Sequence, residues 1–413
     1  MSADEKKAKS KSKKPKKWIK LRHSVVRNIL YFTLGTYSRI KYRTKVEKFK
    51  EQEKRPYLVL LNHQTPFDQF FVGMSFRGPL YYLATEDIFS NGFVSSLIRY
   101  LAAPIPIKKQ TMDVRAVINC MKVSKEGGTI VIAPEGNRTY SGKTEYMSPS
   151  ITALARKLGN PIVLYRLEGG YGVQPRWSDV VRKGKMRAYV YRVIKPEEYA
   201  TMTDDELFAA IKDGLDVNEA VADATFYHKK SAEYLERALY TCPFCGLSEL
   251  ESHNDTVKCL KCGREVRYLP TKELEGVGFE FPHRFVNDWY EAQKTFMNSL
   301  DVREYNEKRM YLDHAEIREV IPYKNKNIVF ENAALSLYGD RIEVESGDEK
   351  LVWDFENVRS AACLGRNKLN VYYGDKIYQI KGGKRFNSLK YVHVYHRCKN
   401  IMQGEMDCEF LGL

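Results

Sequence analysis

Apolar runs alternate with amphipathic stripes between residues 55 and 196. The runs are rich in Val, Ile, Leu and Tyr, which is typical of buried strands. Residues 114–125 and 150–158 lie between runs and carry apolar side chains at helical spacing. This alternation predicts an α/β fold with a mostly parallel sheet. The predicted strands are Tyr57–Leu61, Leu80–Thr85, Thr129–Pro134, Pro161–Leu167 and Met186–Ile194.

The pattern changes after this region. Residues 197–240 are charged and Ala-rich with Leu at helical spacing, and they predict helices that close the α/β domain. Residues 280–320 predict more helix, because large apolar side chains recur about once per turn from Phe285 to Leu300.

Short β-like runs begin at about Asn327. Gly339-Asp340 and Gly374-Asp375 separate neighbouring runs and predict hairpin turns. A helical stretch, Ser388–Met402, comes last. The pattern predicts a small β-rich barrel or sandwich with one closing helix, like that of pleckstrin homology domains.

The positive charge is concentrated at the N-terminus. The 413 residues carry a net charge of +15, of which residues 1–22 contribute +8. A stripe follows at helical spacing: Trp18, Leu21, Val25, Ile29 and Phe32. A basic tail before an amphipathic helix predicts binding to an anionic membrane surface. The alternative is that the stripe packs on the protein core and the tail binds nucleic acid.

No apolar run reaches the ~18–20 residues of a membrane-spanning helix. The N-terminus also lacks the apolar core and cleavage site of a secretory signal. We therefore expect a peripheral or monotopic protein at the cytoplasmic face of a membrane.

Four cysteines form two Cys-x-x-Cys pairs. Cys242 and Cys245 make the first pair, and Cys259 and Cys262 make the second, 13 residues further on. Four thiolates at this spacing are typical of a closed tetrahedral zinc site, which leaves no position for a catalytic water. The sequence therefore predicts a zinc ribbon with a structural Zn²⁺.

Two of the predicted strands end in charged turns. The first turn carries His63 and Asp68, the types needed for a general base that a carboxylate orients. The second turn, residues 134–139, carries Glu135, Gly136 and Arg138. Gly136 permits close backbone approach, and the fork of Arg138 suits a phosphate. Each turn alone also fits an ordinary surface turn.

Together with two further blocks, these turns resemble the glycerolipid acyltransferase family, typified by 1-acyl-glycerol-3-phosphate acyltransferase. The resemblance covers roughly residues 45–215. The chain departs from the family at Lys109, where an Arg is usual, at Asn137, where Thr is commoner, and at Leu164, where a second proline is usual. The four matching blocks are Asn62-His63 followed by Asp68, Ile105–Lys109, Pro134–Arg138 and Pro161–Tyr165.

The resemblance implies transfer of a fatty acyl group from acyl-CoA or acyl-carrier protein to a lysophospholipid hydroxyl. The foremost acceptor is 1-acyl-glycerol-3-phosphate, which gives phosphatidate. His63 would take the acceptor proton while Asp68 fixes its tautomer. Arg138, helped by Lys109, would hold the acceptor phosphate, and the Glu135-Gly136 backbone would complete the pocket.

The alternative is a nucleic-acid-binding or adaptor protein that uses the basic tail and the zinc ribbon. Residues 247–256 of the ribbon contain Glu249, Glu251 and Asp255 but no Lys or Arg, which is a poor surface for phosphates. Nucleic acid is therefore disfavoured as a partner.

These features predict five parts of the chain. They are a basic tail and membrane-associating segment (1–45), an acyltransferase domain (46–240), a zinc ribbon (241–270), a helical connector (271–325) and a β-rich domain with a C-terminal helix (326–413).

Overall fold

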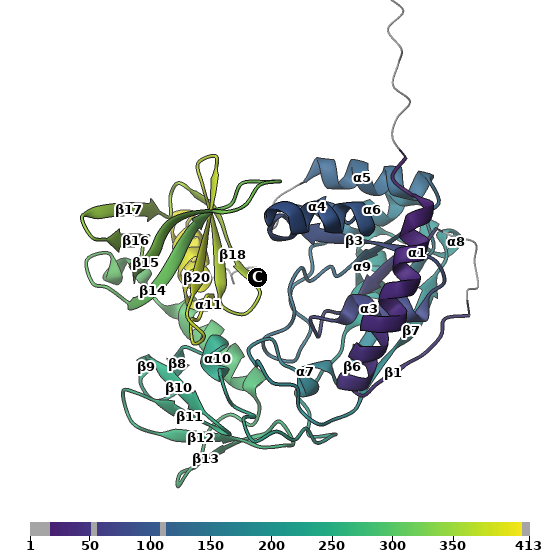
Figure 1. Ribbon diagram of the computed structural model, residues 1–413. Helices are drawn as coiled ribbons and strands as arrows, with labels where there is room; N and C mark the ends of the chain where they lie inside the picture. The colour runs from purple at the N-terminus through teal and green to yellow at the C-terminus, as the bar shows by residue number, and fades with distance from the viewer. Residues whose placement is uncertain (1–16, 51–55, 108–112, 407–413) are drawn as a thin grey trace, which may run out of the picture.

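The computed structural model describes residues 17–50, 56–107 and 113–406 (Figure 1). Its N-terminal part contains a seven-stranded sheet in the order β1-β7-β6-β2-β5-β3-β4. All neighbouring strands in it are parallel except β6 and β7. The predicted α/β fold with a mostly parallel sheet is confirmed. The strands are β1 (Thr44–Val46), β2 (Leu58–Leu61), β3 (Leu80–Thr85), β4 (Ile105–Ile107), β5 (Thr129–Ile132), β6 (Ile162–Glu168) and β7 (Met186–Ile194).

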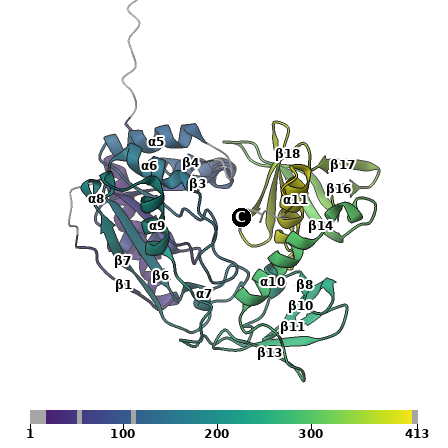
Figure 2. The same cartoon turned by 180° about the vertical axis from the view of Figure 1, so that it is seen from behind.

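Helices cover both faces of this sheet (Figure 2). Alternate side chains of β2 point to opposite faces, as the pleat requires. Leu58 and Leu60 pack with α5 (Val114–Lys125), α6 (Ser150–Leu158) and α9 (Asp204–Leu215). Val59 and its neighbours pack against α3 (Asp68–Ser75) on the other face. The shorter helices are η2 (Glu86–Phe89), α4 (Gly92–Leu101), α7 (Gly170–Val173) and α8 (Pro196–Ala200).

A nearly continuous helical segment precedes β1. It consists of α1 (Leu21–Leu30), a π-helical turn at Tyr31–Gly35 (η1) and α2 (Thr36–Lys41). Trp18 lies before α1, and its indole Nε1 donates to the carbonyl of Ala103 at 2.9 Å. The placement of Trp18 on the exposed stripe was therefore wrong, because its ring packs against the core of the α/β domain. The basic tail up to residue 16 lies outside the described residues.

The helices predicted over 197–240 end at Leu215 apart from a short 3₁₀ turn, η3 (Leu235–Arg237). The chain between them instead forms an irregular segment held by long-range backbone hydrogen bonds. The N–H of Glu219 donates to Gly142 at 2.7 Å, and Lys183 and Tyr227 exchange backbone hydrogen bonds. These long-range hydrogen bonds take the place of helical ones. The helix predicted from the Ala-rich sequence therefore does not form here.

The cysteine-rich segment forms small antiparallel sheets. One contains β8 and β9, and the other has the order β10-β11-β12-β13. Both Cys-x-x-Cys pairs occupy tight turns that end in a glycine with positive φ, Gly246 at 69° and Gly263 at 73°. The strands are β8 (Thr241–Cys242), β9 (Gly246–Leu247), β10 (Leu250–His253), β11 (Thr256–Cys259), β12 (Glu265–Tyr268) and β13 (Leu274–Gly276).

The predicted helix over 280–320 is shorter than expected. It comprises α10 (Val286–Ser299) and the 3₁₀ turn η4 (Val302–Tyr305), and residues Tyr311–Glu319 form strand β14 instead. Buried Tyr311, Ala315 and Ile317 alternate with more exposed residues, which is a strand pattern. Charged side chains at the intervening positions concealed this period in the sequence.

The C-terminal part is a seven-stranded antiparallel sheet followed by a helix. The strand order is β17-β16-β15-β14-β20-β19-β18, and α11 (Leu389–Met402) packs against it. Both predicted hairpin turns are present, and the β-rich domain with a closing helix is confirmed. The likeness to pleckstrin homology domains stays a prediction. The remaining strands are β15 (Asn327–Leu337), β16 (Arg341–Ser346), β17 (Glu349–Asp354), β18 (Val358–Leu364), β19 (Lys368–Tyr373) and β20 (Lys376–Gly382).

The C-terminal half contacts the α/β domain directly. One hydrophobic cluster runs through the ribbon, α10 and the C-terminal sheet, and it includes Tyr140 and Trp177 of the α/β domain. A second contact lies at η2, where Asp87 accepts a hydrogen bond from Gln379 at 3.0 Å and forms an ion pair with Lys326. The halves therefore share a packed and hydrogen-bonded interface.

Candidate active site

The turn after β2 is anchored to the neighbouring strand. The side-chain amide of Asn62 donates to the carbonyl of Leu167 on β6, and its oxygen accepts the Leu167 N–H, both at 2.8 Å. Asn62 is buried. This pair of bonds fixes where the chain leaves the sheet and so places the following residue, His63, at the strand end.

Asp68 orders the rest of that turn from the first position of α3. Its carboxylate accepts the N–H groups of Gln64 at 2.7 Å and Thr65 at 2.9 Å, and the Thr65 hydroxyl at 2.6 Å. The side chain of Asp68 is only 2% exposed. Its position at a helix N-terminus also favours the negative charge.

The same carboxylate holds the imidazole of His63. Nδ1 of His63 lies 2.7 Å from Oδ2 of Asp68, and 30% of the His63 side chain is exposed. Among the described residues, Nε2 has no hydrogen-bond partner. When Nδ1 carries the proton that Asp68 accepts, the lone pair of Nε2 is available to take a proton from a hydroxyl. The pair thus has the geometry of an oriented general base.

The second charged turn lies directly beside the first. Thr139 donates its N–H to the carbonyl of His63 at 3.3 Å. Glu135 accepts the N–H of His63 at 3.1 Å and that of Glu145 at 3.0 Å. Burial raises the pKa of Glu135 to about 8, so this carboxyl group is mostly neutral at pH 7. Glu135 therefore joins the two turns without adding a full negative charge.

Arg138 is a buried cation in this turn. It is 8% exposed, and among the described residues its Nη1 has no hydrogen-bond partner. Burial, reinforced by the positive charges of Arg176 and Arg366, lowers the pKa of Arg138 to about 9, so it stays charged at pH 7. A buried guanidinium with unused donors is costly to keep without a counter-ion, and it suits an anionic ligand.

The remaining sequence-predicted residues fall in different places. Gly136 has φ +67°, and a Cβ there would meet no atom within 4 Å, so its backbone is open to close approach. Lys109 lies outside the described residues. Leu164 packs against α9. Arg166 donates hydrogen bonds to the carbonyls of Asp213 and Gly214, which lie at the C-terminal end of α9.

Sequence reasoning assigned no role to several residues that order these turns. The Gln64 side-chain oxygen accepts the N–H of Tyr171 at 2.8 Å, which fixes α7 against the first turn. The buried Arg176 donates from Nη1 to the carbonyl of Arg138 at 3.1 Å. Gln64 and Thr65 lie between His63 and Asp68, so their polar side chains were a usable signal. Arg176 lies in no recognisable motif and gave none.

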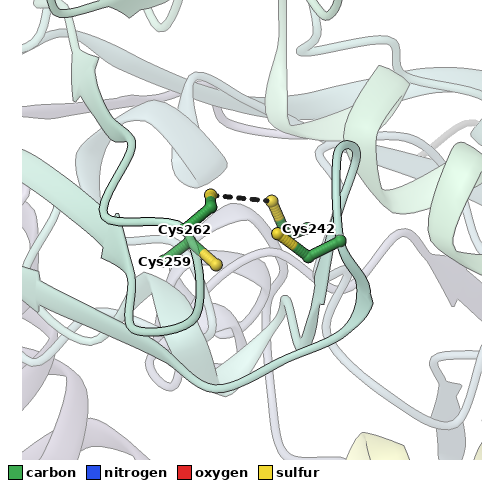
Figure 3. A group of neighbouring side chains, drawn as sticks. Cys242, Cys259 and Cys262 are labelled. Atoms are coloured by element: carbon green, nitrogen blue, oxygen red, sulfur yellow. Dashed lines mark hydrogen bonds between the residues drawn. The ribbon is translucent and has the colours of Figure 1, made fainter.

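The four cysteines meet at one point in the ribbon. Figure 3 shows Cys259 and Cys262 on one loop facing Cys242 on the other. The sulfur atoms of Cys242, Cys245, Cys259 and Cys262 all lie within 4.8 Å of one another. The 3.8 Å between the sulfurs of Cys242 and Cys262 matches the edge of a tetrahedron with Zn–S bonds of about 2.3 Å. The donor set and spacing therefore fit a structural Zn²⁺.

Replacing Cys242 and Cys259 with Ser should remove this metal. The purified chain should lose about one zinc per molecule in elemental analysis, because two of four thiolate ligands are gone. Residues 241–270 should also lose hydrogen-exchange protection.

His253→Ala is the matched control, because His253 is an exposed ribbon residue on β10. Its zinc content should equal that of the unaltered chain. Unchanged zinc in the double Ser variant would contradict the ribbon site.

Comparison with known proteins finds acyltransferases similar to the N-terminal part of this chain. Residues 40–165 match the family model described as Acyltransferase. A chloroplastic 1-acyl-sn-glycerol-3-phosphate acyltransferase from Brassica napus is 22% identical over 40% of this chain, which spans about half (48%) of that relative. The solved 1-acyl-sn-glycerophosphate acyltransferase PlsC from Thermotoga maritima is 22% identical over 46% of this chain and 77% of that one, with a TM-score of 0.39. The resemblance seen in the four sequence blocks is confirmed, and residues 40–165 carry a domain of the acyltransferase family.

Proposed function

We propose that this chain transfers a fatty acyl group from an acyl thioester, acyl-CoA or acyl-carrier protein, to the hydroxyl of a lysophospholipid. The proposed acceptor is 1-acyl-glycerol-3-phosphate, and the product is phosphatidate. The observation that carries this proposal is the Asp68–His63 pair, joined by backbone hydrogen bonds to the turn of buried Arg138. The acyltransferase-family match over residues 40–165 supports the reaction class.

The geometry suggests a direct transfer. Nε2 of His63 takes the proton of the acceptor hydroxyl as its oxygen attacks the thioester carbonyl carbon. Asp68 accepts the hydrogen bond from Nδ1 and stabilises the imidazolium that forms. The C–S bond then breaks, and the thiolate leaves with the proton from Nε2. A positioned base of this kind contributes about 10²–10⁴ in rate.

Arg138 supplies the complementary charge for the acceptor. In 1-acyl-glycerol-3-phosphate a single glycerol arm separates the reacting hydroxyl from the phosphate. The turns of His63 and Arg138 are hydrogen-bonded side by side, and we propose that one small headgroup reaches both side chains. We propose that Glu135 and Gly136 shape the same pocket and that Lys109 assists Arg138.

We also propose that the reaction takes place at the cytoplasmic face of a membrane. No helix in the described residues has the length and apolar character to cross a bilayer. However, α1 and α4 lie together, since Arg22 donates to the carbonyl of Tyr100 at 2.7 Å and stacks on its ring. Both helices expose large apolar side chains, which suits insertion into the headgroup region. They are Leu21, Val25, Ile29, Phe93, Val94, Leu97 and Tyr100, and Phe32 in η1 extends the set.

His63→Ala should reduce acyl transfer by about 10²–10⁴-fold, because the variant lacks the general base. The assay uses purified protein, a labelled acyl thioester and a panel of lysophospholipids, with the product identified by mass. Zinc content and thermal unfolding should remain those of the unaltered protein.

His314→Ala serves as the control for loss of a histidine, since His314 is exposed on β14. It should keep full activity. Near-normal turnover by His63→Ala would rule out the proposed mechanism.

Replacing Phe32 and Phe93 with Ser should weaken binding to anionic phospholipid vesicles by about 10²- to 10⁴-fold, since each aromatic insertion is worth ~1.5–3 kcal/mol. Both side chains are 81% exposed, so thermal stability should change little. Co-sedimentation measures the binding. Ile328→Ser, an exposed apolar change on β15, is the control. Equal sedimentation of the double variant and the control would refute this membrane face.

A further inference from the structure

The C-terminal sheet extends one turn onto the proposed active site. Residues 365–367 connect β18 to β19, and Gly365 has φ +60°, which the turn requires. Arg176 donates from Nε to the carbonyl of Gly365 at 3.0 Å and from Nη1 to the carbonyl of Arg138 at 3.1 Å. A single buried guanidinium therefore joins the turn of the C-terminal domain to the turn that carries Arg138.

Arg366 follows at the tip of this turn. Its Nη1 donates to Asp179 at 2.8 Å, and Asp179 also accepts a hydrogen bond from Arg237 at 2.7 Å. Arg366 is 28% exposed, so part of its guanidinium is accessible. Its positive charge lowers the pKa of Arg138, after burial and Arg176. Burial raises the pKa of the Tyr42 hydroxyl, and the positive charge of Arg366 acts in the opposite direction.

Positive charge exceeds negative charge around these residues. Four guanidinium groups lie in this region: those of Arg237 and Arg366 pair with Asp179, that of Arg176 binds the carbonyls of Gly365 and Arg138, and that of Arg138 is buried beside them. Burial raises the pKa of the nearby Glu135 to about 8, so this group compensates little at pH 7, and burial also raises the pKa of Glu145. Asp68 is occupied by His63 and its own turn. An excess of partly buried cations is costly in isolation and favours a bound anion.

We propose that Arg366 of the C-terminal domain forms the second half of an anion site with Arg138, and that this site binds the phosphate of the acceptor. Arg176 is a positioning residue that holds both turns in register. The inference rests on the proposed function for the identity of the acceptor. The anion site itself rests on the contacts of Arg176 with Gly365 and Arg138, on the Arg366–Asp179 pair, and on the Arg138 donor that has no partner among the described residues.

Two phosphate sources have this chemistry, the acceptor headgroup and the phosphates of coenzyme A. The acceptor is favoured because its phosphate is one glycerol arm from the hydroxyl that His63 would deprotonate. The CoA phosphates are separated from the thioester by the long pantetheine arm. The C-terminal domain would thus help to select acceptors that carry a phosphomonoester.

Arg366→Gln tests this directly in the full-length protein on lipid vesicles. The KM for 1-acyl-glycerol-3-phosphate should rise about 10- to 100-fold, as expected for loss of a charge-assisted contact. The KM for acyl-CoA should stay within about twofold. Arg366→Lys keeps the charge and should recover part of the loss.

Arg359→Gln is the matched control. Arg359 lies on β18, the strand that leads into the turn of Arg366, and pairs with Asp375 at 3.1 Å on an exposed surface. Its kinetics should equal those of the unaltered protein. An unchanged acceptor KM in Arg366→Gln would overturn the inference, and a rise only in the acyl-CoA KM would assign the anion to the donor instead.

A binding measurement separates this site from the proposed reaction. Glycerol 3-phosphate should raise the Tm of the unaltered protein and of Arg359→Gln, whereas glycerol should not. Arg366→Gln should lose most of that rise. An equal rise in Arg366→Gln would overturn the anion site, whether or not the chain transfers acyl groups. Absence of acyl transfer by the unaltered protein, with the Tm response intact, would instead contradict the proposed function alone.

Discussion

The carboxylate of Asp68 is the constraint on which the proposed site depends. It accepts two backbone N–H groups, one hydroxyl and the imidazole of His63. The same group therefore builds the turn and orients the ring, so the turn has little freedom to rotate the ring away. The buried amide of Asn62 fixes the start of the turn on β6. An oriented imidazole whose Nε2 is unused is the consequence.

The second constraint is electrostatic: the buried guanidinium of Arg138 lies where few negative charges balance it. Neutral Glu135 joins the turns of His63 and Arg138. Burial of Arg138 makes a bound phosphate more favourable than it would be on an open surface. Arg176 ties the β18–β19 turn of the docked C-terminal sheet to the backbone of Arg138. Substrate binding and domain docking are thereby linked in the proposed account.

Much of the α/β domain could be predicted, because short periodic patterns report local structure. Each of the five predicted strands is a single short apolar run. His63 and Asp68 lie in one turn, and the four cysteines lie in two neighbouring turns. What failed was set by distant contacts. Residues 216–234 form an irregular segment bonded to Gly142 and Lys183, and the strand pattern of β14 was concealed by charged residues. Arg176 contacts Arg138 across 38 residues of the chain, and Arg366 comes near Arg138 only when the C-terminal domain docks, so no local pattern could identify either residue.

The most direct test of the central claim is the rate of acyl transfer by Asp68→Asn, with the product identified by mass. Asparagine keeps the size of the side chain but removes the charge that stabilises the imidazolium. The account predicts a rate at least about 10²-fold lower, with the protein still folded and zinc retained. A rate equal to that of the unaltered protein would mean that His63 does not act as a base oriented by Asp68.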